Sequence, residues 1–84
     1  MPLYYFHTQD NQTLPDRAGT ELPDLTAAKV EAVRLAAKTL TQHAETFWTE
    51  GEWTLQVTDH TGLTLFVLTF LATEAPATRR DRPL

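Results

Sequence analysis

One long amphipathic helix, predicted from Leu25 to the residue before Gly51, limits what the rest of this chain can fold into. Asp24 precedes it as an N-cap, whose carboxylate accepts from free N–H groups of the first turn, and Gly51 ends it. The apolar positions at helical spacing are Leu25, Ala32, Val33, Ala36, Leu40, Ala44 and Phe47. Because one helix covers only one face of a sheet, the flanking strands decide the architecture.

Strand patterns lie on both sides of this helix, at residues 3–8, 13–15, 53–58 and 63–70. Pro15 has no N–H to donate, so the second of them is an edge strand. Residues 63–70 are apolar on both alternating faces, which is typical of a central strand. The sequence predicts an α+β fold of order ββαββ, with a small, mostly antiparallel sheet and one long helix packed across one face. The first and last strands are expected side by side in its centre, with parallel pairing left open.

Three motifs in this order resemble a widespread family of short bacterial proteins. They are the opening Met1-Pro2-Leu3-Tyr4-Tyr5-Phe6-His7, then Glu21-Leu22-Pro23-Asp24-Leu25 before an Ala-rich helix, then Val57-Thr58-Asp59 with Gly62. The family is classed as a domain of unknown function with the layout PRYFFH…ELPDLEAA…EVTDEAG. The resemblance implies the fold but no activity, cofactor or catalytic residue. Gln56 departs from it, since an acidic residue is common there.

Length and composition indicate a single domain at residues 1–72 followed by a flexible C-terminal tail at residues 73–84. The chain has 84 residues and no cysteine, which fits a reducing, cytoplasmic setting. No apolar run is long enough for a membrane span, and no signal peptide is recognised. The formal charge is −4, although Arg79, Arg80 and Arg82 cluster in the tail. An acidic body repels phosphate backbones and argues against nucleic-acid binding.

The residues that carry enzyme chemistry are sparse, so we expect no enzyme, no metal and no cofactor. The chain has neither cysteine nor serine. A metal site would need His7, Asp59 and His60 to converge at one end of the sheet, because no histidine pair has ligand spacing. Asp24 and Asp59 are interpreted as a helix cap and a turn former.

Pro2 supports one enzymatic alternative. Removal of Met1 would expose a secondary amine that titrates near neutrality and acts as a base when desolvated. Such a site resembles the tautomerase superfamily, whose small members also begin Met-Pro. Residues 8–23 interrupt the strand-to-helix link which that superfamily requires.

The main functional prediction is a contact surface. If the helix covers one sheet face, the second face exposes Tyr5, Phe66, Leu68 and Phe70, or else the alternates Leu65 and Val67. An exposed apolar patch of that kind marks an interface, so we expect a homo-oligomer or a protein partner and identify no small-molecule ligand. In the opposing interpretation Trp48, Trp53 or the tail covers this face within a monomer. A nucleic-acid-linked, antitoxin-like regulator is the second functional class.

Overall fold

The computed structural model describes residues 1–10 and 12–75 and has an α+β fold with a mostly antiparallel sheet. Its elements are β1 (Leu3–Gln9), β2 (Thr13–Leu14), β3 (Thr20–Glu21), α1 (Leu25–Gln42), α2 (Ala44–Glu50), β4 (Glu52–Thr58) and β5 (Thr64–Leu71). The predicted class is therefore confirmed, whereas the ββαββ order is only partly matched. A short strand, β3, was missed, and the predicted single helix is divided in two.

The strand order corrects the expected pairing. The sheet runs β2-β1-β4-β5, and β3 also pairs with β1, beside β2 along the same edge. The first and last long strands, β1 and β5, were expected side by side in the centre, but they are not neighbours. All pairs are antiparallel, so the alternative of parallel pairing is wrong as well. β4 lies in the centre between β1 and β5, and β5 is an edge strand. A central position in the sheet therefore does not explain why β5 is apolar on both faces.

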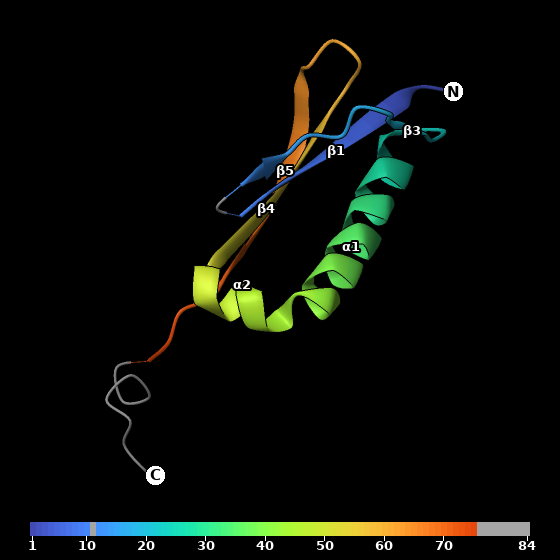
Figure 1. Ribbon diagram of the computed structural model, residues 1–84. Coiled ribbons are helices and arrows are strands. Elements are labelled where there is room, and N and C mark those ends of the chain that lie inside the picture. The colour runs from blue at the N-terminus through green and yellow to red at the C-terminus, as the bar shows by residue number, and fades with distance from the viewer. Residues whose placement is uncertain (11, 76–84) are drawn as a thin grey trace.

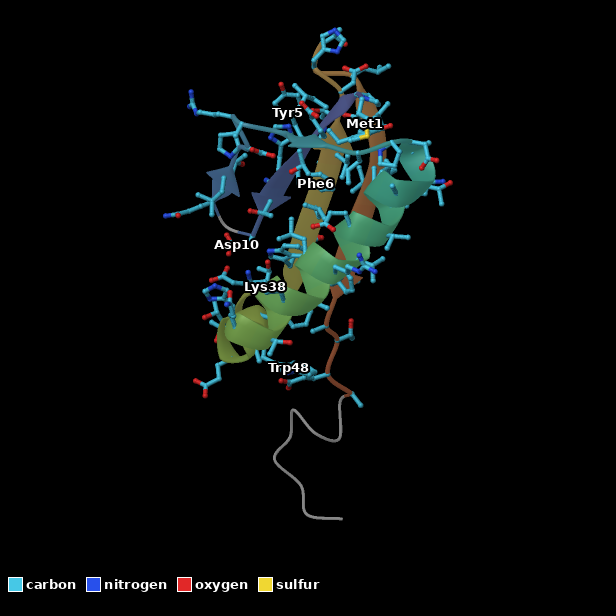
Figure 2. All side chains as sticks on the ribbon, turned by 90° about the vertical axis from the view of Figure 1, so that its right-hand side faces the viewer. Met1, Tyr5, Phe6, Asp10, Lys38 and Trp48 are labelled. Atoms are coloured by element: carbon cyan, nitrogen blue, oxygen red, sulfur yellow. The ribbon has the colours of Figure 1, made fainter. Side chains whose placement is uncertain are left out.

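The core lies between the sheet and the helices, which cover one face of it (Figure 1). β1 supplies Tyr4 and Phe6, and β4 supplies Trp53, Leu55 and Val57, all buried. Figure 2 shows α1 crossing in front of the strands. Its contact stripe consists of small residues at intervals of four, which let the helix axis lie close to the sheet. These residues are Ala28, Ala32 and Ala36, each at most 1% exposed.

The helical face differs from the predicted one. Val33 was expected on the buried face but is 57% exposed, and Leu25 is 40% exposed. The contact with the sheet follows the stripe of Ala28, Ala32 and Ala36, and Val33 lies outside this stripe. His43 also interrupts the helix, with φ −123° and ψ 36°. α2 then turns back towards the sheet, where Phe47 packs against the core.

The structure has the helix cap, the helix end and the turn at the residues that the sequence predicted. The Asp24 carboxylate accepts from the N–H of Ala27 at 2.8 Å and caps α1. Gly51 ends α2 in the left-handed region at φ 81°. In the β4–β5 hairpin, Asp59 Oδ1 accepts from the N–H of Thr61 at 2.8 Å and forms the predicted turn. These three predictions are confirmed.

After Leu71 the described chain has no regular secondary structure up to residue 75. Most of the predicted flexible tail at residues 73–84 lies outside the described residues. None of the helices in the described ranges combines the length and apolar character needed to cross a membrane.

Candidate functional site

The four residues predicted to form an interface do not share one face of the sheet. Phe66, Leu68 and Phe70 alternate along β5 and lie half-buried beside the core, on the side of the helices. Their partners in β4 are the buried Val57, Leu55 and Trp53. Tyr5 lies between the buried Tyr4 and Phe6 and therefore points to the opposite face. The common surface expected from the sequence is thus corrected, while a contact with a partner through β5 stays a prediction.

The face opposite the helices is largely polar rather than apolar. From β1 it receives Tyr5 and His7, whose rings stack with centroids 6.5 Å apart. From β4 and β5 it receives Thr54, Gln56, Thr58, Val67, Thr69 and Leu71. Gly19, at φ 75°, lies so close to the Tyr5 ring that an added Cβ would be 2.9 Å from Cε2. The loop before β3 therefore covers the aromatic side chain that was expected to be exposed.

A polar cluster of His7, Asp16 and Thr58 lies on this face. His7 Nε2 is 3.0 Å from Thr58 Oγ1, and His7 Nδ1 accepts from the backbone N–H of Asp16 at 3.0 Å. Since Nδ1 accepts, the neutral ring carries its proton on Nε2 and donates to the threonine hydroxyl. A base that activates a nucleophile must instead accept the hydroxyl proton. In this arrangement the histidine positions the loop and does not activate Thr58.

Asp16 holds this loop against the middle of β1. Its carboxylate accepts from the N–H of Phe6 at 3.1 Å, between the short stretches where β2 and β3 pair with β1. It also accepts from the N–H groups of Ala18 at 3.0 Å and Gly19 at 3.1 Å. Burial by itself would raise the pKa of Asp16, but the three donated hydrogen bonds outweigh it and lower that pKa below its ordinary value. The Asp16 carboxylate therefore accepts a hydrogen bond from β1 where neither β2 nor β3 pairs with that strand.

The residues Asp16-Arg17-Ala18-Gly19 have the composition of a turn, but the sequence does not show the role of Asp16. The available signal was an Asp three residues before a Gly, which is typical of a side chain that caps its own turn. The contact with β1 is non-local and has no sequence signature.

The histidines and Asp59 do not come together as metal ligands. His7 binds the Asp16 loop, whereas Asp59 is engaged in its hairpin with Thr61 and Leu63. His43 and His60 are exposed at different ends of the molecule. No group of three possible metal-binding side chains occurs within residues 1–10 and 12–75.

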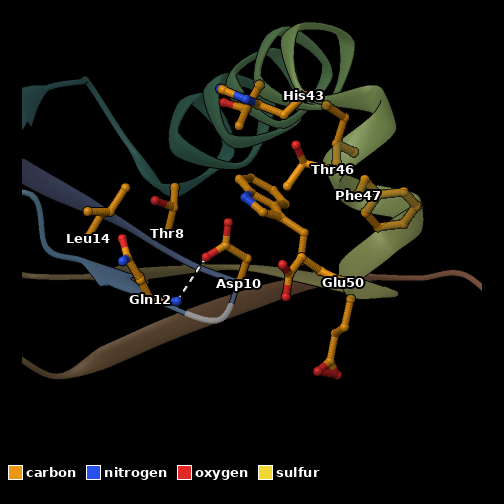
Figure 3. A pocket seen from close by; sticks show the side chains of 12 residues that line it. Thr8, Asp10, Gln12, Leu14, His43, Thr46, Phe47 and Glu50 are labelled. Atoms are coloured by element: carbon orange, nitrogen blue, oxygen red, sulfur yellow. Dashed lines mark hydrogen bonds between the residues drawn. The ribbon is translucent and has the colours of Figure 1, made fainter.

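A cavity of about 160 Å³ lies where α2 meets the ends of β1 and β4. It was not predicted. Its lining consists of Thr8, Asp10, Gln12, Leu14, Thr39, Leu40, His43, Thr46, Phe47, Glu50, Glu52 and Trp53. Figure 3 shows Asp10 on the strand side and His43 and Thr46 on the helical side of this space, with the Asp10 carboxylate accepting from the N–H of Gln12 at 2.9 Å. The cavity combines carboxylates with an aromatic wall.

The fold and these sites define a small α+β domain in which two helices cover one face of an antiparallel sheet. The chain belongs to a family described as a domain of unknown function, DUF6894, whose model matches residues 3–72. The family resemblance seen in the sequence is thereby confirmed. No curated protein and no solved structure matches the chain. The matched region ends just after β5, so the family's domain is the unit of sheet and helices.

Proposed function

We propose that this domain is a small cytoplasmic interaction module that forms a homodimer by pairing β5 with β5 of a second copy. The carrying observation is the free edge of β5, which has β4 on one side and no partner strand on the other in the described part of the chain. Such an edge presents N–H and C=O groups that another strand satisfies. The cytoplasmic setting is supported by the absence of cysteine.

β5 lacks the features with which monomeric proteins protect an edge. Residues 64–71 contain no charged residue and no proline. The register shift beside Thr58 affects only the hairpin end, and from Phe66 to Leu71 the strand pairs regularly with β4. Long, uncharged and regular edges are the ones that pair with another chain. The edge is therefore suited to a second copy.

The side chains of β5 match themselves about a two-fold axis. An antiparallel pair centred on Leu68 places Leu68 beside its counterpart and Phe66 beside the second copy's Phe70. Cross-strand aromatic pairs contribute roughly 0.2–1 kcal/mol each, and covering the half-buried row removes further apolar area from water. On the other face, Val67 is 48% and Leu71 is 71% exposed. Both apolar rows of β5 thereby gain neighbours.

Sedimentation velocity over a range of concentrations tests the proposal with two matched variants. Val67→Lys adds a charge at the free edge, and Gln56→Lys adds the same charge on the same face at its direct partner position in β4. We expect a dimer for the native chain and for Gln56→Lys, and a monomer for Val67→Lys. A native chain that stays monomeric at the highest concentration contradicts the proposal, as does a Val67→Lys variant that still dimerises.

A further inference from the structure

Trp48 is an exposed aromatic side chain on α2. It is 60% exposed, whereas the neighbouring Phe47 packs against the core. The rings of Phe47 and Trp48 meet edge to face, with centroids 6.2 Å apart, so the indole ring is supported by the core through Phe47. Tryptophan is highly buried on average and is enriched at protein interfaces. The position of Trp48 relative to the free edge of β5 therefore matters.

The orientation of α2 turns Trp48 away from β1. Thr46 and Glu50 of α2 line the cavity beside the ends of β1 and β2. Trp48 is two residues from each of them, which at about 100° per residue places it on the opposite side of the helix. Since β1 and β5 lie on opposite sides of β4, this direction leads towards β5. Figure 2 shows Trp48 beside the point where the described chain leaves the sheet.

The end of β5 lies next to α2. The N–H of Ala72 donates to the carbonyl of Gly51, the C-cap of α2, at 2.9 Å, and Figure 1 shows the chain leaving the sheet beside this helix. Phe70, near the end of β5, contacts the buried Trp53 with ring centroids 5.9 Å apart. Aromatic side chains thus continue from the core to the free edge.

The self-matching register of β5 brings an aromatic ring of the second copy to this place. In an antiparallel pair centred on Leu68, the second copy's Phe66 lies beside Phe70. Cross-strand neighbours share one face of a sheet, so that ring comes to the face on which α2 lies. We propose that Trp48 extends the dimer interface onto α2 by packing its indole ring against the second copy's Phe66. This contact rests on the proposed pairing of β5 with β5.

The contact adds area to an interface that is otherwise only one strand wide. Stable protein interfaces bury about 1,200–2,000 Å² of surface in total. An aromatic side chain buries roughly 150–250 Å², so the exposed 60% of the two Trp48 side chains offers about 180–300 Å². Few residues carry most of the binding energy of an interface, and tryptophan is enriched among them.

Sedimentation velocity over a dilution series tests the contribution of Trp48 to dimerisation. Trp48→Ala should raise the dissociation constant of the dimer by at least about 10-fold, as expected for an interface tryptophan. Leu14→Ala is the matched control, because Leu14 is 61% exposed but lies in β2, at the opposite edge of the sheet. Its dissociation constant should equal that of the native chain. Circular dichroism checks that both variants are folded.

Acrylamide quenching of tryptophan fluorescence reports the contact directly. In the native chain, quenching should decrease as the concentration rises through the range of dimerisation, because the indole ring of Trp48 becomes covered. Trp48→Phe keeps an aromatic ring at the interface but leaves Trp53, which is 6% exposed, as the only tryptophan. Its quenching should be weak and independent of concentration. A double-mutant cycle of Trp48→Ala with Phe66→Leu should give less than additive losses of affinity, since the two residues are in contact.

The outcomes separate this contact from the dimer on which it rests. A native chain that is monomeric at every concentration overturns the pairing of β5 and the Trp48 contact together. A native dimer that Val67→Lys dissociates, but that has the same dissociation constant in Trp48→Ala and Leu14→Ala, overturns the Trp48 contact alone. Quenching that is equal in the native monomer and the native dimer overturns it as well.

Discussion

Replacing Asp16 should destabilise the protein more than its place in a partly exposed loop suggests. The carboxylate accepts three backbone hydrogen bonds, and the one from Phe6 comes from the middle of a core strand. In Asp16→Ala the Phe6 N–H loses this acceptor, which costs about 1–3 kcal/mol for a desolvated donor. Ala18 and Gly19 regain water in part and add up to roughly 1 kcal/mol together. The sum is about 1–4 kcal/mol.

The assay is thermal unfolding followed by circular dichroism. For a domain of this size, each kcal/mol lowers Tm by about 4–8 °C, so we expect a loss of roughly 5–30 °C at neutral pH. Asp10→Ala is the matched control, because among the described residues the Asp10 carboxylate accepts one exposed N–H, that of Gln12. It should lower Tm by no more than a few degrees. A Tm of Asp16→Ala within the error of the control would refute the reasoning.

The stability contributed by the Asp16 carboxylate should depend on pH in a defined direction. Hydrogen bonds lower the pKa of Asp16 in the folded state, whereas the pKa of an unfolded Asp is about 3.9. Stability from such a group is fully present above the unfolded pKa and is lost as the pH falls through the lower, folded pKa. The Tm difference between the native chain and Asp16→Asn should therefore be constant above about pH 5 and shrink towards pH 2. A difference that grows on acidification would contradict the charge-dependent role.

Four further substitutions test the fold by urea unfolding. Asp24→Ala should cost about 0.5–2 kcal/mol through the lost cap of α1, and an unchanged midpoint would refute the cap. Leu55→Ala, at a fully buried core position, should cost about 2–5 kcal/mol, and a loss below 1 kcal/mol would contradict its burial. Gly19→Ala should lower the free energy of unfolding more than Gly62→Ala does. Both positions have positive φ, but only at Gly19 does the new Cβ meet the Tyr5 ring, so equal losses would contradict that contact.

The parts of the fold that the sequence predicted correctly depend on local chemistry. Asp24 binds an N–H three residues away, and Gly51 adopts a conformation that other residues avoid. The break at His43 was missed because neither proline nor glycine marks it, and the turn of α2 towards the sheet is a tertiary effect. The periodicity of α1 placed Val33 in the core, but the observed contact follows the alanine stripe. Period alone does not distinguish a small-residue stripe from the more apolar stripe beside it.

The candidate sites were harder to predict because each joins segments that are distant in the sequence. The Asp16 loop reaches His7 and Thr58, which come from two paired strands. The cavity brings the end of β1 next to α2 and the start of β4. Composition did identify the basic tail and the acidic body separately. The hydrogen bond from the Ala72 N–H to the Gly51 carbonyl shows that the described chain leaves the sheet beside the end of α2.

The position of β5 connects the sequence to the proposed dimer. A strand that is apolar on both faces is expected in the middle of a sheet, where both faces are covered. In the single chain β5 instead lies at the edge, with Phe66, Leu68 and Phe70 half-buried and Val67 and Leu71 exposed. Pairing with a second copy gives β5 a neighbour on each side and makes it central in a continuous sheet. The sequence pattern and the fold then agree for the dimer, which is why the free edge, rather than a whole sheet face, is the surface to test.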